Sequence, residues 1–226
     1  MMEVLKVWGK ELWIENNDLY CGKKLHLLKG GVCSLHHHPT KMETFTIESG
    51  CVKLELEEEV FDLAPGESKT ILPGQSHRFS GYRDSIISEF STAHSDDDVV
   101  RKTESYLTPV LWCFDIDGTL EASDGIISGE SIRGLEFGIV SSRSRARSLE
   151  ICEAMGIVPN FVVCCRVVGR SEELNSVDRM FPIRRTIYVG DMESDKSEAL
   201  RAGWQFFYPG EFVRRIETES PQEIRS

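Results

Sequence analysis

Residues 30–50, GGVCSLHHHPTKMETFTIESG, decide the fold of the N-terminal half of this chain. Within them His36 and His38 are separated by one residue, and because side chains alternate along a strand, both point to the same face. Glu43 follows five residues after His38, inside another strand-like segment. Two imidazoles and one carboxylate therefore come from one short stretch, and both groups are common ligands of divalent metal ions.

A third imidazole comes from His77, which follows a Pro73-Gly74 turn. Three imidazoles and one carboxylate can hold one divalent ion and leave positions open for water or substrate. The donor set fits Mn, Fe, Zn and Ni. The sequence therefore predicts a metal site formed by His36, His38, Glu43 and His77.

Short alternating segments that end at Gly and Pro turns surround this stretch. Strands spaced so closely are typical of a β-sandwich or barrel. The acidic run at residues 57–59 is expected at a solvated strand end or hairpin tip. The strand-like segments are Lys24–Leu28, Glu43–Ile47, Val52–Leu56, Ser68–Ile71 and Ser85–Phe90.

The spacing of the candidate ligands resembles the first sequence motif of the cupin family. That motif reads Gly30, five residues, His36-x-His38, four residues, Glu43, six residues and Gly50. The stretch from Gly66 to His77 resembles the second cupin motif, with one extra residue before the proline and with Gly81 where the family often has Asn. The resemblance implies an all-β cupin fold, a double-stranded β-helix jelly roll, with His36, His38, Glu43 and His77 as metal ligands.

The flanking segments narrow the resemblance to one group of cupins. Residues 8–13 (WGKELW) and 89–94 (EFSTAH) look like the cupin modules of sugar-phosphate isomerases and of sugar-nucleotide pathways. The similarity covers about residues 5 to 100. It implies a module that binds or isomerises a sugar, and a cupin that has lost its metal and only binds a sugar stays open as an alternative.

Beyond residue 110 the pattern changes to apolar strand-like runs separated by amphipathic segments of helix length. This alternation predicts a parallel sheet with helices on its faces. Residues 92–108 contain an acidic run and few large apolar side chains, so we expect a linker there. The predicted domains are 1–105, the cupin domain with its linker, and 106–226, an α/β Rossmann-like domain. The apolar runs are Val110–Phe114, Phe137–Val140, Phe161–Val163, Thr186–Val189 and Gln205–Tyr208, and the helical segments are Ser144–Met155, Ser171–Phe181 and Glu193–Ala202.

Acidic residues follow two of these predicted strands. Asp115 and Asp117 come directly after the first apolar run, and Asp191 and Asp195 follow the fourth. The carboxyl ends of parallel strands meet at one edge of a sheet, where open α/β sheets bind ligands. Neighbouring carboxylates repel each other unless a cation neutralises them, and Mg²⁺ prefers such oxygen ligands. The sequence therefore predicts a Mg²⁺ site at this edge.

The second half resembles the haloacid dehalogenase (HAD) superfamily of aspartate-nucleophile phosphatases through the motif Asp115-Ile116-Asp117-Gly118-Thr119 and the downstream pair Asp191 and Asp195. The resemblance covers about residues 110 to 210. It implies Asp115 as nucleophile and Asp117 as general acid and base. It also implies substrate contacts from Gly118 and Thr119, and Mg²⁺ bound by Asp115, Asp117 through its backbone carbonyl, Asp191 and Asp195.

Two further roles follow from the same resemblance. Ser141, at the end of the next strand, would donate a hydrogen bond to a phosphoryl oxygen, with Ser142 as its alternative and as a substrate contact. The family's phosphate-binding lysine is absent between Leu120 and Asp195, so its role passes to Arg170 or, as the alternative, to Arg166.

Composition excludes several classes of protein. The 226 residues are 40% hydrophobic, which is enough for packed cores, and the net charge of −11 repels nucleic acid and anionic membrane surfaces. No apolar run approaches the roughly 20 residues that span a bilayer, and no secretory signal begins the chain. The odd count of seven cysteines favours reduced thiols. We expect a cytoplasmic protein.

Taken together, the two resemblances imply a Mg²⁺-dependent phosphoric monoester hydrolase that acts on a sugar phosphate or related metabolite through an aspartyl-phosphate, fused to a metal-binding cupin. In one alternative the cupin is a sugar or sugar-phosphate isomerase or epimerase, and the HAD-like half is regulatory. In another the protein binds sugar and phosphate without catalysis. We also expect a homodimer that forms through the cupin domain.

Overall fold

The computed structural model describes residues 2–165 and 170–218. The chain divides into two compact units, unit 1 (Met1–Thr108) and unit 2 (Pro109–Ser226), and each has its own hydrophobic core. All seven cysteines are free thiols. Within the described ranges, none of the helices has the length and apolar character needed to cross a membrane.

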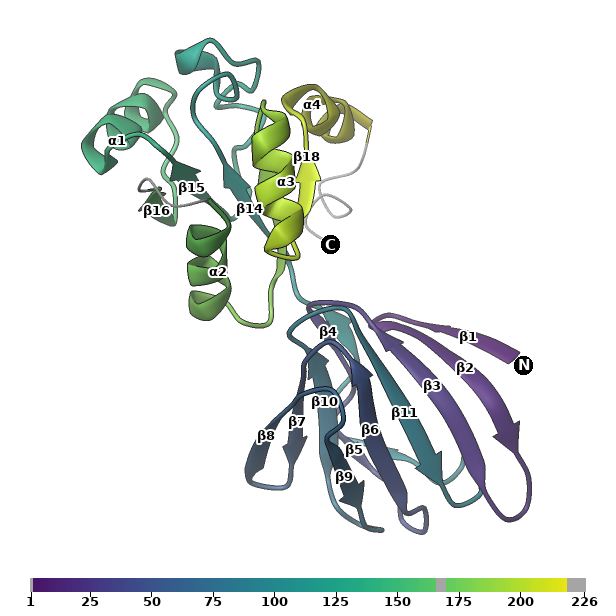
Figure 1. The fold of residues 1–226 in the computed structure, drawn as a ribbon. Coiled ribbons are helices and arrows are strands. Elements are labelled where there is room, and N and C mark those ends of the chain that lie inside the picture. Colours follow the sequence, from purple (N-terminus) through teal and green to yellow (C-terminus); the bar gives the residue numbers. More distant parts are fainter. Residues whose placement is uncertain (1, 166–169, 219–226) are drawn as a thin grey trace. The chain divides into compact units, whose positions relative to one another are not determined.

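One layer of unit 1 is a six-stranded antiparallel sheet with the strand order β1-β2-β3-β11-β6-β9 (Figure 1). Its strands are β1 (Met2–Lys6), β2 (Gly9–Asn16), β3 (Cys21–Leu27), β6 (Glu43–Ser49), β9 (Ser68–Ile71) and β11 (Ser85–Ser91).

The other layer is a seven-stranded antiparallel sheet in which β10 pairs with three neighbours, β4, β5 and β7. Its strands are β4 (Gly31–Val32), β5 (His36–His37), β7 (Val52–Leu56), β8 (Glu59–Leu63), β10 (His77–Gly81), β12 (Val100–Arg101) and β13 (Tyr106–Leu107). Strands β7 and β8 form a hairpin whose turn contains Glu57 with φ 53°.

An apolar core lies within unit 1. Along β7 the residues Val52, Leu54 and Leu56 are buried, whereas Lys53 and Glu55 between them are partly exposed, as expected for a strand with one buried face. The predicted β-rich fold of the N-terminal half is therefore confirmed. The same core also contains Trp8, Phe45, Ile47, Phe79 and Ile87.

Residues 92–108 differ from the predicted linker because part of this stretch belongs to the second sheet. Strand β12 pairs with β5, and β13 pairs with β4. The backbone N–H of Thr108 also donates to the carbonyl of Gly30 at 2.8 Å. These partners lie far away in the sequence, so a local reading of composition misses the pairing.

Unit 2 contains a five-stranded parallel sheet with the order β16-β15-β14-β17-β18. This arrangement agrees with the predicted alternation of strands and helices, but a fold of this type is shared by many activities and shows no superfamily by itself. The strands are β14 (Val110–Phe114), β15 (Phe137–Ser141), β16 (Phe161–Cys164), β17 (Arg185–Val189) and β18 (Gln205–Phe207).

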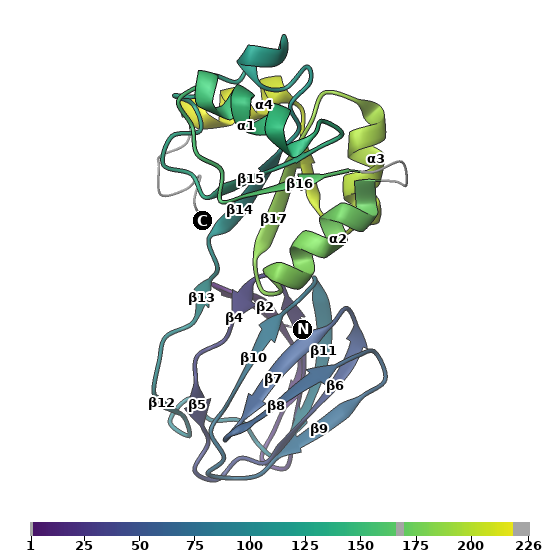
Figure 2. The ribbon, with the colours of Figure 1, turned by 90° about the vertical axis from the view of Figure 1, so that its left-hand side faces the viewer.

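Helices cover both faces of this sheet (Figure 2). Trp112 and Phe114 of β14 pack in one core with residues of α1 and α4, and Leu111 and Cys113 pack in another with residues of α2 and α3. Both faces of β14 are buried, which explains why the run is apolar throughout. The helices are α1 (Arg145–Ala154), α2 (Arg170–Met180), α3 (Glu193–Arg201) and α4 (Pro209–Thr218), and a short 3₁₀ helix spans Glu121–Ser123.

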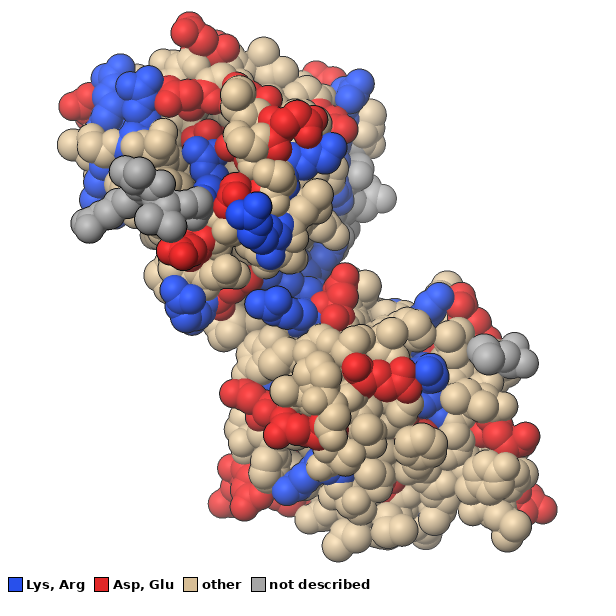
Figure 3. Space-filling view, in the orientation of Figure 1, with Lys and Arg blue, Asp and Glu red and all other residues tan. Residues whose placement is uncertain are grey.

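Charges of both signs are mixed on the surface of unit 2. Figure 3 shows its Lys and Arg side chains interspersed with Asp and Glu on the visible face. The described residues on that face therefore form no continuous basic stripe of the kind that tracks a nucleic-acid backbone.

The core of unit 1 gives a direct test of this packing. We expect Leu54→Ala to lower the free energy of unfolding of unit 1 by about 2–5 kcal/mol, because Leu54 is 0% exposed and its loss leaves a cavity. Leu5→Ala, at a side chain that is 77% exposed, should change it by less than about 0.5 kcal/mol. Urea unfolding measures both, and similar losses in the two variants would contradict the packing described here.

Candidate metal centre

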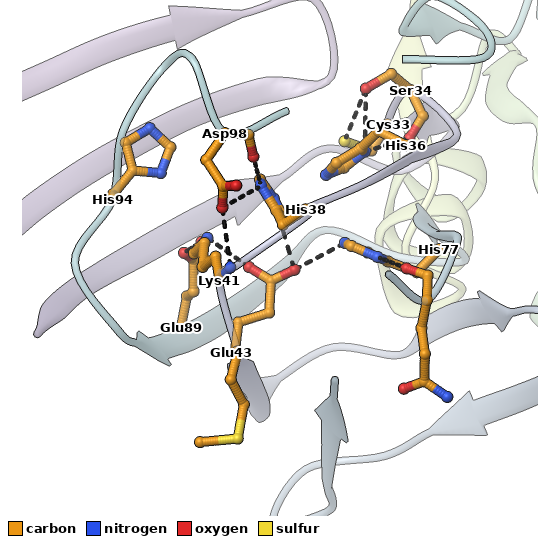
Figure 4. Close-up of polar contacts among 12 residues, drawn as sticks. Cys33, Ser34, His36, His38, Lys41, Glu43, His77, Glu89, His94 and Asp98 are labelled. Carbon is orange, nitrogen blue, oxygen red and sulfur yellow. Dashed lines mark hydrogen bonds and ion pairs between the residues drawn. The ribbon is translucent and has the colours of Figure 1, made fainter. Parts of the chain in front are cut away.

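The four predicted ligands of unit 1 lie together (Figure 4). His36 belongs to β5 and His38 follows that strand, while Glu43 begins β6 and His77 begins β10. His36 and His77 are directly opposite each other in the β5–β10 pairing. One donor atom from each of the four side chains lies within 4.8 Å of the others, so a single ion fits among them.

Each of the three histidines uses its Nδ1 atom for a hydrogen bond to a backbone carbonyl. An Nδ1 that donates a proton leaves Nε2 as the atom with a free lone pair, and this arrangement is typical of metal-binding histidines. The acceptors are Ser34 for His36 at 2.8 Å, Gln75 for His77 at 3.0 Å, and Asp98 for His38.

The Nε2 atom of His77 lies 2.7 Å from Oε1 of Glu43. Both atoms are buried, and neither has a hydrogen-bond partner among the described residues. With the His77 proton on Nδ1, two acceptors face each other, and buried acceptors without a donor cost free energy. A cation bound by both atoms removes that cost, so the donor set fits a divalent metal ion.

The charge states of the ligands suit the same role. Burial, aided by His77, lowers the pKa of His36 to about 3, and burial also lowers the pKa of His38. Burial alone would raise the pKa of Glu43, but contacts with His77 and Lys41 outweigh it and hold that pKa below its usual range. At neutral pH His36 and His38 are therefore neutral imidazoles and Glu43 is a carboxylate, which are the protonation states that bind metals.

A cavity of about 160 Å³ opens beside these ligands. Two indole side chains, Trp8 and Trp13, form part of its wall, and Lys23, Glu89 and His94 contribute polar groups. Nζ of Lys23 lies 4.1 Å from the centre of the Trp13 ring. The cavity thus combines aromatic surface with buried hydrogen-bonding groups next to a candidate metal ion, a combination that suits a small polar ligand.

In unit 2 the structure brings together three of the predicted acidic ligands. Asp115 follows β14, Asp191 follows β17, Asp195 lies in α3, and one oxygen of each is within 4.8 Å of the others. Arg170 already supplies a positive charge there, because its Nη1 is 2.9 Å from Asp115 Oδ2 and also contacts Asp195. The same Nη1 donates to the hydroxyl of Tyr188 at 2.6 Å.

The carboxylate of Asp117 lies outside this cluster. It accepts from Arg143, with Nε at 2.9 Å and Nη2 at 2.8 Å, and both side chains are exposed. Gly118 turns the chain with φ +65°, and a Cβ at this position would lie 2.3 Å from Oδ2 of Asp191. Any other residue at position 118 would need a left-handed backbone and a shift of the Asp191 carboxylate, which favours glycine, while the neighbouring Thr119 is fully buried.

Two of the remaining predicted residues, Ser141 and Ser142, lie at the carboxyl end of β15. Ser141 ends β15, is buried, and accepts from the backbone N–H of Arg143 at 3.4 Å. Ser142 is exposed. Arg166 lies outside the described residues.

Comparisons with known proteins bear on unit 1. A family model described as "Cupin domain" matches residues 24–85. A D-lyxose/D-mannose isomerase from Thermosediminibacter oceani is 36% identical over 111 residues, which cover 37% of this chain and 61% of that protein. A D-lyxose ketol-isomerase from Cohnella laeviribosi is 36% identical over 110 residues, which cover 36% of this chain and 60% of that protein. The chain thus spans about three fifths of the length of these two relatives.

These relatives correct the predicted enzyme class. The prediction of a phosphoric monoester hydrolase is wrong, because the relatives are named as isomerases, and an isomerase cleaves no phosphate ester. In the structure Arg170, which the sequence suggests as the phosphate-binding residue, pairs with the predicted nucleophile Asp115 and with Asp195. The comparisons also give no support to membership of the HAD superfamily or to Mg²⁺ in unit 2.

We expect the purified protein to carry a divalent transition metal in unit 1. His77→Ala should abolish this binding, because it removes a buried donor from the cluster. His37→Ala is the matched control, since His37 neighbours two ligands but is not in the cluster. Metal content after dialysis measures the difference, and equal metal loss in both variants would contradict the proposed ligand set.

The metal-free protein should lose stability as the pH falls from 6.5 toward 3. The pKa of His36 is lowered from 6.5 to about 3, so between these values the unfolded chain binds a proton that the folded chain does not. Stability therefore rises with pH in this window, by up to about 1.4 kcal/mol per pH unit. Urea unfolding in EDTA between these pH values should show that the free energy of unfolding depends less steeply on pH in His36→Gln than in the wild type. Equal pH dependence in the two proteins would refute His36 as the origin of the effect.

A longer match settles the family. A D-lyxose ketol-isomerase from Thermofilum sp. is 32% identical over 123 residues, and the match covers 68% of that protein and 42% of this chain. Together with the matched cupin model, the β-rich fold and the clustered histidines of unit 1, this relationship shows that the chain belongs to the cupin family through its N-terminal part.

Proposed function

We propose that unit 1 is a metal-dependent ketol-isomerase that interconverts an aldose such as D-lyxose and the corresponding 2-ketose. The observation that carries this proposal is the cluster of His36, His38, Glu43 and His77, whose histidine Nε2 atoms are free to bind an ion beside a cavity. The names of the relatives support the reaction class.

A divalent ion in this site supplies a Lewis acid for the carbonyl and neighbouring hydroxyl oxygens of an open-chain sugar. The chain itself must hold the sugar, exclude water and accept a proton from carbon. Trp8 and Trp13 provide apolar surface in the cavity, and carboxylate oxygens of Glu11 and Glu89 provide proton acceptors there. The lysine side chains at the same wall can donate hydrogen bonds to hydroxyl groups.

We propose a sugar without a phosphate group, in place of the phosphorylated substrate expected from sequence. The lysines of the cavity are already paired with carboxylates: Lys6 with Glu11 at 3.3 Å, Lys23 with Glu11 and Glu89 at 3.8 Å each, and Lys41 with Glu43 and Glu89 at 2.5 and 2.6 Å. A phosphate dianion would have to break such a pair to gain a buried cation, whereas neutral hydroxyl groups would not.

Activity should depend on unit 1 alone. With Mn²⁺ supplied, we expect aldose-to-ketose conversion to fall on the order of 100-fold or more in His36→Ala, because a ligand is lost. Asp115→Asn is the control in unit 2 and should retain activity. Ketose formation from neutral aldoses and from their phosphates measures both points.

Absence of turnover on the whole panel would favour the alternative of a non-catalytic sugar-binding protein. Activity confined to sugar phosphates would contradict the proposed substrate class. Loss of activity in Asp115→Asn would show that unit 2 takes part in the reaction.

Three finer expectations stay predictions. These are Mg²⁺ at Asp115, Asp191 and Asp195, membership of unit 2 in the HAD superfamily, and a homodimer through unit 1. Calorimetric titration with Mg²⁺ of the wild type against Asp191→Asn tests the first, and light scattering of the purified chain tests the third.

A further inference from the structure

Lys41 is a buried lysine held between two buried carboxylates. Its side chain is 3% exposed, and Nζ lies 2.5 Å from Oε2 of Glu43 and 2.6 Å from Oε1 of Glu89 (Figure 4). Its backbone N–H donates to Oδ2 of Asp98 at 2.9 Å. Both ends of the residue are therefore fixed, and burying an ammonium group is tolerable only with such partners.

The two oxygens of Glu43 have different neighbours. Oε1 faces the histidines, at 2.7 Å from Nε2 of His77 and 3.9 Å from Nε2 of His38. Oε2 is occupied by the ammonium group of Lys41. Oε1 is therefore directed at the candidate metal site, whereas Oε2 is used in the ion pair with Lys41.

The far side of Lys41 is also restrained. Glu89 lies on β11, next to β6 that carries Glu43, and it is 3.8 Å from a second buried lysine, Lys23. Lys23 in turn packs over the ring of Trp13. The row of alternating charges Glu43, Lys41, Glu89 and Lys23 therefore runs along the cavity wall and resists rotation of any member.

We propose that Lys41 is a positioning residue that restricts Glu43 to coordination through one oxygen. This inference rests on the proposed function. An octahedral ion that takes one donor from each of the four side chains keeps about two positions for other ligands. Both would then be open to oxygens of the sugar, such as the carbonyl oxygen and the neighbouring hydroxyl oxygen. A carboxylate that coordinates through both oxygens would take one of these positions.

The test counts the exchangeable water molecules on Mn²⁺ bound to the full-length protein, by water proton relaxation. Lys41→Met keeps most of the side-chain length and removes the charge, so Glu43 is free to bind through both oxygens. We expect about two exchangeable waters in the wild type and about one in the variant, with relaxivity reduced by about half. Lys24→Met is the control, because Lys24 pairs with Glu48 at 3.0 Å on an exposed part of unit 1.

A second variant guards against failure of the first to fold. Glu89→Gln leaves Lys41 with one carboxylate partner. The relaxivity should therefore fall as in Lys41→Met, but by a smaller factor. In the isomerase assay the KM for the aldose should rise more than kcat falls in Lys41→Met, whereas Glu89→Gln is judged by relaxivity alone because Glu89 is also a candidate proton acceptor. Thermal unfolding of the metal-free proteins separates this effect from a general loss of stability, which would lower relaxivity only through lost metal.

Unchanged relaxivity in folded, Mn²⁺-loaded Lys41→Met would overturn the proposal. Complete loss of Mn²⁺ from a folded variant would also overturn it, because the lysine would then be needed for metal binding and not for positioning Glu43. The readout needs no sugar. If the variants lower relaxivity as expected but the wild-type protein isomerises no aldose, the proposed function is refuted and the role of Lys41 is left intact.

Discussion

The close approach of two buried acceptors, Nε2 of His77 and Oε1 of Glu43, is the constraint on which the centre of unit 1 depends. Neither atom gains a hydrogen bond among the described residues, and the His77 proton is committed to the carbonyl of Gln75. Two lone pairs at this distance are stable only if positive charge lies between them or beside them. A divalent ion would provide it, and the neutral state of His36 and His38 leaves room for that charge without repulsion from these two imidazoles.

The sheets supply the geometry that this constraint requires. His77 and His36 come from paired strands, and the side chain of Glu43 enters from the other sheet, so the donors approach from both layers of the sandwich. Hydrogen bonds to these side chains then fix their orientation. Backbone carbonyl groups accept from the imidazoles, and Lys41 donates to the carboxylate of Glu43. Each ligand is thus oriented by a group that is itself part of the fold, which is how proteins set metal affinity and open positions.

Local sequence was sufficient for the donors but not for the groups that orient them. His36, His38 and Glu43 lie within eight residues, and strand alternation alone places the two histidines on one face. The residues that complete the site come from elsewhere: Asp98 lies in a stretch that reads as a polar linker, and Glu89 is 48 residues from Lys41. Helix α4 was missed although its sequence carries the signal, because Phe212, Val213 and Ile216 recur at helical spacing and face one core. Composition near a residue does not reveal a partner that tertiary structure supplies.

Unit 2 shows why a motif needs its chemical surroundings. Asp115, Asp191 and Asp195 do converge, as expected from the ends of parallel strands, but a guanidinium group balances part of their charge. A carboxylate paired with a buried arginine is stabilised as an ion pair, and the positive charge beside it competes with a metal ion for the same oxygens. The carboxylate of Asp117 is likewise engaged, by Arg143. The same carboxylate spacing is therefore compatible with a metal site and with an arginine-bridged structural cluster, and the identity of the cation at its centre decides between them.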